Sequence, residues 1–226
     1  MAHRLTVSIE RPGEMDCALD HAAAALRSGE LIVIPTDTVY GLACATSDAE
    51  AVKRIFEVKR REATMPLPVL VGRRQDVTQM AANAPDALKT LGARHWPGPL
   101  TIIVPKSEAI SDVLTGGYPT VGLRMPDHPV TLRLLRRSGP LAATSANISG
   151  HPAPVTVHDI EQEILDDVSI VIDAGPCPVG QASTVLDLTQ TPPAILRQGS
   201  ISAETIEADL QTTVSVRVTD DSQEDE

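Results

Sequence analysis

Aromatic side chains are scarce in this 226-residue sequence, which has one Trp, two Tyr and one Phe. Proteins that bind single-stranded nucleic acid stack the bases on aromatic rings, so this scarcity argues against such a binder. Apolar residues nevertheless make up 42% of the chain. We therefore expect a core of Ala, Val, Leu and Ile that needs neither metals nor disulfides.

Cysteine is also scarce: Cys17, Cys44 and Cys177 are widely spaced, odd in number and form no CxxC pair. This pattern indicates separate thiols rather than a disulfide framework or a metal site. Apolar runs of membrane-spanning length are missing, as is the apolar segment of a signal peptide. The sequence therefore predicts a soluble, cytoplasmic protein without membrane association.

An excess of basic charge is missing too, because the formal net charge is -11. This argues against a protein-wide basic field that would attract nucleic acid. A local basic region remains over 53–61 with Arg73 and Arg74. The last ten residues hold five acidic side chains and one basic one. We predict a folded domain over 1–212 and an acidic, disordered tail over 213–226.

Helical and strand patterns mix irregularly along the chain. An Ala-rich helix is expected over Asp16–Arg27, a buried strand over Leu31–Pro35, and a helix over Asp48–Lys59 capped by Ser47 or Asp48. The other expected strands are 67–71, 100–105, 120–124, 141–143, 169–173, 184–188 and 194–197, with one or two helices in 75–94 and helices at 129–137 and 203–210. Without an internal repeat or a long linker, this pattern predicts a single α/β domain around a large mixed sheet.

Several common catalytic motifs are absent. The sequence contains no GxxxxGK[ST] loop, no GxGxxG after a strand, no GxSxG and no HExxH. Polar clusters instead follow three expected strands or helices, at Pro35–Gly41, Lys59–Arg61 and Ala143–Gly150. Strand ends are where α/β proteins usually build their sites.

Each cluster has a functional and a purely structural interpretation. Pro35–Gly41 is suited to a small polar ligand or to a capped turn. The cations of Lys59–Arg61 could bind a polyphosphate or simply stabilise a helix C-terminus. Ala143–Gly150 could let a ligand approach the backbone or form a turn. Arg124 and Arg197 end apolar strands, where a charge needs an anionic partner from the protein or from a ligand.

Seven segments in this order resemble the YrdC-type threonylcarbamoyl-AMP synthase family, from about Asp16 to Leu210. They are PTDTVYGL (35–42), K-x-R with PLPVLV (59–71), WPGPLT (96–101), VGLRMPDHP (121–129), TSANISG (144–150), ASTVLDL (182–188) and LRQG (196–199). The resemblance implies an open, strongly twisted α/β sheet with flanking helices and a deep positive cleft. It also implies synthesis of threonylcarbamoyl-AMP and pyrophosphate from L-threonine, bicarbonate and ATP.

The family further implies a partner transferase that moves the threonylcarbamoyl group onto an adenosine of tRNA. Any direct binding of tRNA is expected to be weak. Mg²⁺ would accompany ATP, held mainly by phosphate oxygens and water rather than by the protein. In the implied reaction a carbamate of threonine attacks the α-phosphorus of ATP.

Site residues follow from the matching positions. Thr36, Arg124 and the backbone of Ala143 are expected to bind threonine. Lys59 and Arg61 resemble the catalytic K-x-R pair on the ATP phosphates. The other residues expected near the nucleotide are Ser145, Asn147, Thr120, Ser183 and Arg197.

Two departures from the family pattern lie in the phosphate loop. Glu62 stands where proline often follows K-x-R, and Met65 replaces a polar residue. Two rival functions remain: a double-stranded RNA or tRNA binder, which the acidic charge disfavours, and a carbamoyl-transfer domain. The latter normally belongs to longer chains with zinc-finger and acylphosphatase parts, which this sequence lacks.

Overall fold

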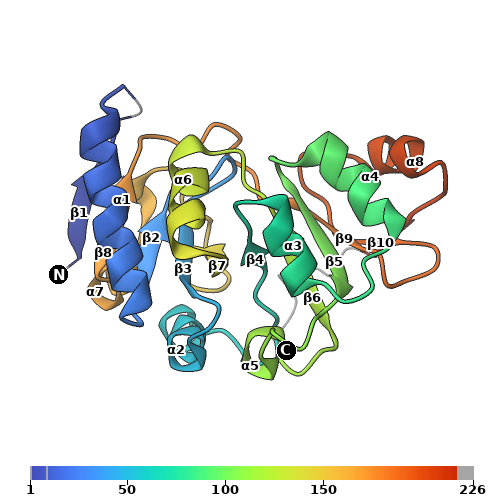
Figure 1. The fold of residues 1–226 in the computed structure, drawn as a ribbon, viewed down its shortest axis with the longest axis horizontal. Coiled ribbons are helices and arrows are strands. Elements are labelled where there is room, and N and C mark those ends of the chain that lie inside the picture. The colour runs from blue at the N-terminus through green and yellow to red at the C-terminus, as the bar shows by residue number, and fades with distance from the viewer. Residues whose placement is uncertain (1, 9, 218–226) are drawn as a thin grey trace.

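The computed structural model describes residues 2–8 and 10–217. These residues form an 11-stranded sheet with the order β1-β8-β2-β3-β7-β4-β6-β5-β9-β10-β11 (Figure 1). Parallel pairs such as β2–β8 and antiparallel pairs such as β3–β7 both occur, which confirms the predicted mixed sheet.

The elements run as follows. The strands are β1 (His3–Thr6), β2 (Ile32–Ile34), β3 (Gly41–Ala45), β4 (Val69–Leu70), β5 (Leu100–Pro105), β6 (Thr120–Arg124), β7 (Leu141–Ser145), β8 (Ile170–Asp173), β9 (Thr184–Asp187), β10 (Ala194–Arg197) and β11 (Ser215–Val216). The helices are α1 (Pro12–Arg27), α2 (Ala49–Lys59), α3 (Arg74–Met80), α4 (Asp86–His95), α5 (Asp112–Thr115), α6 (Pro129–Ser138), the 3₁₀ helix η1 (Val157–Asp159), α7 (Gln162–Asp167) and α8 (Ala203–Leu210).

Strand β2 separates two hydrophobic cores. Ile32 and Ile34 belong to the core that includes residues of α1 and α6. Their neighbours Leu31 and Val33 belong to the other core, with residues of α2. Because successive side chains of a strand point to opposite faces, a fully apolar run suits a strand covered on both sides. In Figure 1, α1 and α6 lie side by side over one face of the sheet.

Helix α1 begins at Pro12, so the predicted start at Asp16 was wrong. Proline fits the first turn of a helix because the missing N–H has no partner there anyway. The additional turn includes Met15, which is buried against the same core as the Ala-rich part of the helix. This first turn has no periodic apolar residues, so the sequence pattern did not indicate a helix there.

Helix α2 delivers the basic cluster to the site. Asp48 caps its N-terminus, accepting hydrogen bonds from the N–H groups of Glu50 and Ala51, both at 3.0 Å. The helix ends at Lys59, and the next residue, Arg60, caps it with a left-handed φ of 51°. This turn sends Lys59 and Arg61 in a different direction from Arg60.

Three strands were not predicted: β1, β3 and β11. Strand β3 is short and rich in small residues, and its pairing with β2 and β7 is a long-range feature. Strand β11 lies within the predicted tail and pairs in parallel with β10, so the tail prediction was wrong for Ser215 and Val216. The rest of that tail, from 218, lies outside the described residues.

Candidate active site

The loop after β2 positions Thr36 and closes on itself. The Thr36 hydroxyl accepts hydrogen bonds from the N–H groups of Thr38 (3.1 Å) and Val39 (3.2 Å) and donates to the Val39 carbonyl (2.6 Å). Thr36 and Thr38 are both buried. The short turn is therefore held by its own side chains, in agreement with the structural interpretation of this cluster, and it presents the next residue, Asp37, to the neighbouring strands.

Arg124, at the end of β6, is buried beside this loop. Its Nη2 donates to Asp37 Oδ1 at 2.6 Å, and its Nε donates to the Gly98 carbonyl at 3.1 Å. Burial lowers the pKa of the Arg124 guanidinium, the carboxylate of Asp37 opposes this shift, and the charge of Arg197 adds to it. The sequence predicted that Arg124 needs an anionic partner from the protein or from a ligand. Asp37 is such a partner within the protein.

Arg197 and Ser183 form a second polar group near Arg124. Arg197 donates from Nε to the Ser183 carbonyl and from Nη2 to the Ser183 hydroxyl, both at 3.1 Å. The same hydroxyl lies 2.8 Å from that of Thr101 on β5. Two arginines therefore meet at one end of β6, β9 and β10, which concentrates positive charge in an otherwise acidic chain.

Lys59 is buried and reaches the end of β7. Its Nζ donates to the carbonyls of Ser145 (2.6 Å) and Asn147 (2.5 Å), and Asn147 Oδ1 lies at 3.4 Å. The backbone carbonyl of Lys59 accepts from the N–H of Ser149 at 3.0 Å. Burial lowers the pKa of Lys59 to about 7, Arg61 contributes to the lowering, and Glu161 opposes it.

The three consecutive cations point in different directions. Arg61 donates to the carbonyls of Met65 (3.4 Å) and Pro66 (3.3 Å), within the segment that leads to β4. Arg60 turns away and forms an ion pair with Glu163 of α7 at 2.7 Å. Arg60 has a left-handed backbone conformation, and its side chain points away from those of Lys59 and Arg61. Lys59 and Arg61 are the two cations of the K-x-R pattern.

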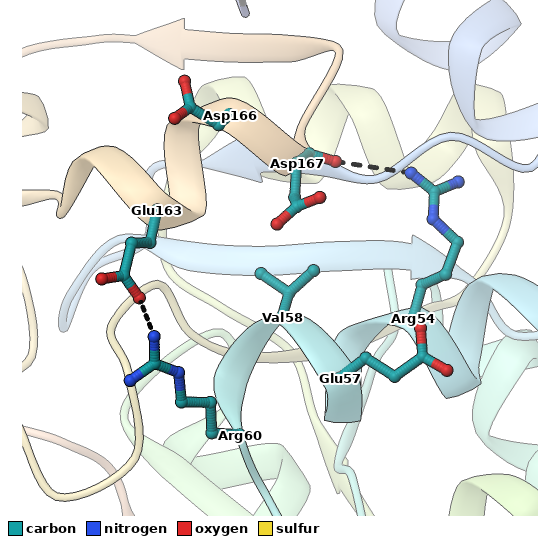
Figure 2. A pocket seen from close by; sticks show the side chains of 7 residues that line it. All are labelled: Arg54, Glu57, Val58, Arg60, Glu163, Asp166 and Asp167. Atoms are coloured by element: carbon teal, nitrogen blue, oxygen red, sulfur yellow. Dashed lines mark hydrogen bonds and ion pairs between the residues drawn. The ribbon is translucent and has the colours of Figure 1, made fainter.

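A surface hollow of about 440 Å³ lies on the Arg60 side of α2 (Figure 2). Arg60 with Glu163, and Arg54 with the carbonyl of Asp167, bridge its two walls. Its lining includes none of the site residues predicted from the sequence. The lining of the hollow has four acidic side chains and two basic ones, so it offers no positive field for the phosphates of a nucleotide.

The loop after β7 is held from several sides. Asn147 Nδ2 donates to the carbonyls of Ile148 (2.9 Å) and His151 (2.7 Å), and the Ile148 N–H donates to Glu161 Oε2 (2.7 Å). The N–H of Ala146 donates to the Tyr40 carbonyl at 2.9 Å. This loop therefore links the Lys59 region to the Thr36 loop.

The remaining predicted residues occupy strands of the sheet. Ala143 lies in β7 opposite Ala43, and its N–H donates a hydrogen bond to the Pro68 carbonyl at 3.0 Å. Thr120 begins β6, and strand alternation places it on the same face as Arg124, about 13 Å away along the strand. The structure thus brings Thr36, Arg124, Ser183 and Arg197 into one group and Lys59, Ser145 and Asn147 into another.

Sequence patterns did not reveal roles for Asp37 and Thr101. Asp37 lies inside the Pro35–Gly41 cluster, and the available signal was a carboxylate in the loop that follows a buried strand. Thr101 was hidden in the apolar run of β5, where only the later pairing with β9 brings it to Ser183. Both roles depend on long-range contacts, that of Asp37 with Arg124 and that of Thr101 with Ser183.

Comparisons with known proteins agree on one family. The Sua5/YciO/YrdC family model, described as telomere recombination, matches residues 24–199. A threonylcarbamoyl-AMP synthase of Pyrococcus abyssi is 44% identical over 187 residues, covering 82% of this chain and 55% of that protein. One of Bacillus subtilis is 42% identical over 195 residues, covering 85% and 56%. The chain thus spans about half the length of these relatives.

Solved structures show the same fold. A crystal structure of P. abyssi Sua5 complexed with L-threonine matches with a TM-score of 0.85 and 38% identity, covering 94% of this chain and 62% of that one. E. coli YciO matches with a TM-score of 0.79 at 22% identity, covering 91% and 100%, and indicates the fold alone. These matches confirm the predicted fold class.

Metal clusters and membrane spans are both missing from the described part of the chain. Over 2–8 and 10–217, no three His, Cys, Asp or Glu side chains are grouped so that they could hold a metal ion. Over the same residues, every helix is too short or too polar to cross a lipid bilayer. All three cysteines lie in this part and are free thiols.

Proposed function

This chain belongs to the Sua5/YciO/YrdC family, and on that premise we propose that it is an L-threonylcarbamoyladenylate synthase. The proposed reaction joins L-threonine, bicarbonate and ATP into threonylcarbamoyl-AMP, with release of pyrophosphate and water. One observation carries the proposal: two polar groups with buried cations, around Arg124 and around Lys59, are joined by the loops after β2 and β7.

The group around Arg124 is the proposed threonine site. A guanidinium has five N–H donors, and Asp37 and Gly98 account for two of those of Arg124. The other three donors are suited to the two oxygens of an amino-acid carboxylate. Thr36 and the backbone of Ala143 would line the same site, and the complex of the P. abyssi relative with L-threonine supports this substrate.

The group around Lys59 and Arg61 is the proposed site of the ATP phosphates. In this group Lys59 brings its charge to the loop and holds the carbonyls of Ser145 and Asn147, so that the loop's exposed groups face the nucleotide. Arg61 would neutralise charge on the departing pyrophosphate. Ser183 and Arg197 belong to the group around Arg124, so their proposed contacts are with the part of the nucleotide that lies next to threonine. Thr120 is the remaining proposed nucleotide contact.

The chemistry then requires positioning rather than a strong base. The threonine amine captures carbon dioxide, and the resulting carbamate oxygen attacks the α-phosphorus of ATP as pyrophosphate leaves. Because the carbamate is already an anion, orientation and charge neutralisation account for the proposed rate increase. The described residues offer no cage for Mg²⁺. Mg²⁺ enters the proposal, as the family resemblance implies, as part of the ATP substrate, held mainly by phosphate oxygens and water.

The proposed product, threonylcarbamoyl-AMP, needs a second protein that uses it. A partner transferase would accept the threonylcarbamoyl group and place it on an adenosine of tRNA, with little direct binding of tRNA to this protein. A cytoplasmic location is part of the same proposal, because ATP, threonine and tRNA meet in that compartment.

Pyrophosphate release tests the proposed reaction. With ATP and bicarbonate present, we expect release to require L-threonine and to fall when serine replaces it. Release that ignores the amino acid would contradict the proposal, and a salt titration against tRNA would then test the nucleic-acid alternative.

The Arg61→Ala variant tests the phosphate site, with Arg60→Ala as its matched control. We expect Arg61→Ala to lower turnover on the order of 10²-fold while the protein stays folded. Arg60→Ala removes only an exposed ion pair with Glu163, so turnover should change little. Equal losses in the two variants would remove Arg61 from the proposed mechanism.

A further inference from the structure

Asp37 holds a buried position between three segments of the site. The loop after β2 supplies it, and its Oδ1 accepts both Arg124 Nη2 at 2.6 Å and the backbone N–H of Asp127 at 3.1 Å. The side chains of Asp37 and Arg124 are only 5% and 9% exposed. Asp37 is therefore held by the backbone on one side and holds a guanidinium on the other.

Arg124 depends on Asp37 for its orientation. An arginine side chain is flexible, and its second anchor is the Gly98 carbonyl, which accepts from Nε. Two anchors on different nitrogens fix the plane and the rotation of the guanidinium. Removing the one on Nη2 leaves the group free to rotate about Nε.

We propose that Asp37 is a positioning residue for recognition of the substrate carboxylate, acting through Arg124. This inference rests on the function proposed above. Asp37 directs the remaining N–H donors of Arg124 toward the threonine carboxylate and itself contacts neither threonine nor ATP. Its second oxygen, Oδ2, is enclosed by protein, which fits a role in holding Arg124 rather than in touching the ligand.

Asparagine at position 37 keeps the size of the side chain and removes its charge. Oδ2 of Asp37 and Nδ1 of His128 are both buried without a hydrogen-bond partner among the described residues. Burial lowers the pKa of His128, and the carboxylate of Asp37 opposes this shift. In Asp37→Asn the side-chain oxygen still accepts from the Asp127 N–H, while the charge that holds Arg124 is lost.

The test compares L-threonine with threoninol, the amino alcohol that lacks the carboxylate, in pyrophosphate-release kinetics. For Asp37→Asn we expect the KM for threonine to rise about 10-fold or more, because a neutral amide oxygen holds the guanidinium less strongly than a carboxylate does and Arg124 loses its fixed orientation. The KM for ATP should stay within about 2-fold. The KM or inhibition constant of threoninol should change much less, because its neutral hydroxymethyl group cannot form the bidentate, charged pair with Arg124 that a carboxylate forms.

Asp187→Asn is the matched control. Asp187 is also buried, but its Oδ1 accepts from the N–H and hydroxyl of Thr189 rather than from a guanidinium. This variant measures what loss of a buried carboxylate does to the fold, and its threonine KM should match that of the unchanged protein. A thermal unfolding curve for each variant accompanies the kinetics.

Three outcomes for Asp37→Asn would overturn the inference: an unchanged threonine KM, an equal rise for threonine and threoninol, or a fall in threonine KM. The last would show that Asp37 competes with the substrate for Arg124. Failure of the unchanged protein to require threonine would instead contradict the proposed function. If Asp37→Asn does not fold, Asp37→Glu, which keeps the charge but displaces it by one methylene, serves in the same comparison with the same expected and contrary outcomes.

Discussion

Lys59 is a buried cation whose charge depends on pH near neutrality. Burial lowers its pKa to about 7, so at pH 8 most molecules of the free protein carry a neutral Lys59. A bound polyphosphate favours the charged form and raises this pKa. ATP binding at pH 8 should therefore draw a proton onto Lys59.

Calorimetry of ATP binding at pH 8 measures this proton. In buffers of different ionisation enthalpy, we expect the unchanged protein to take up more protons than Lys59→Arg, whose side chain stays charged throughout. The difference should vanish below about pH 6, where Lys59 is protonated before binding. Identical proton uptake by both proteins at pH 8 would show that Lys59 does not change its charge.

Single residues also mark the limit of what the sequence could predict about the site. The K-x-R pattern selected Lys59 and Arg61 as a pair distinct from Arg60, but the cause of their separation, a left-handed backbone at Arg60, is not written in the residue types. Nor does any local pattern reveal that Lys59 donates to the end of β7, because Ser145 lies 86 positions away. Roles of this kind depend on long-range contacts.

At the scale of elements, the sequence predicted strands well where apolar runs are long and clearly ended. Strands β5, β6 and β10 and helix α8 have the predicted bounds. Strand β3, by contrast, reads GLACA and has few of the β-branched residues that mark strands. It exists because β2 and β7 pair with it on both sides, which sequence patterns do not reveal.

The loop after β10 supports the Ser183–Arg197 group through a glycine. A Cβ at Gly199 would lie 2.4 Å from both the Ala182 carbonyl oxygen and the Thr184 backbone nitrogen. We expect Gly199→Ala to destabilise the protein by about 1–3 kcal/mol and to reduce activity, because the backbone at Ser183 must move. Urea unfolding and pyrophosphate release measure the two effects.

Gly13→Ala is the control for that substitution. Gly13 lies in the first turn of α1, and nothing is within 4 Å of the position its Cβ would take. Because alanine is the better helix former, this variant should gain up to about 1 kcal/mol. A Gly199→Ala protein as stable and as active as Gly13→Ala would contradict the proposed close packing.

At the scale of the whole molecule, the sheet continues beyond the expected end of the domain. In β11, the Ser215 N–H donates to the Pro193 carbonyl at 2.9 Å, and the Arg217 N–H donates to the Ile195 carbonyl at 2.8 Å. The strand lies beside β10, which carries Arg197. In the prediction, the acidic residues from Asp220 onward outweighed the two valines, Val214 and Val216, that flank Ser215.

Two truncated chains test the contribution of β11. A chain that ends at Thr212 should be less stable than one that ends at Arg217 by about 1–3 kcal/mol, because it loses two backbone hydrogen bonds and the cover of β10. Equal unfolding midpoints would indicate that β11 adds nothing to the fold. Both chains should be compared by denaturant unfolding under identical conditions.

Isolation of the reaction product tests the central claim most directly. The protein is incubated with ATP, L-threonine and ¹³C-bicarbonate, and nucleotides are separated and weighed by mass spectrometry. We predict an adenylate with the mass of threonylcarbamoyl-AMP that carries the ¹³C label and is absent without threonine. If the only products are ADP or AMP without the label, the chain does not make threonylcarbamoyl-AMP and the proposed function is wrong.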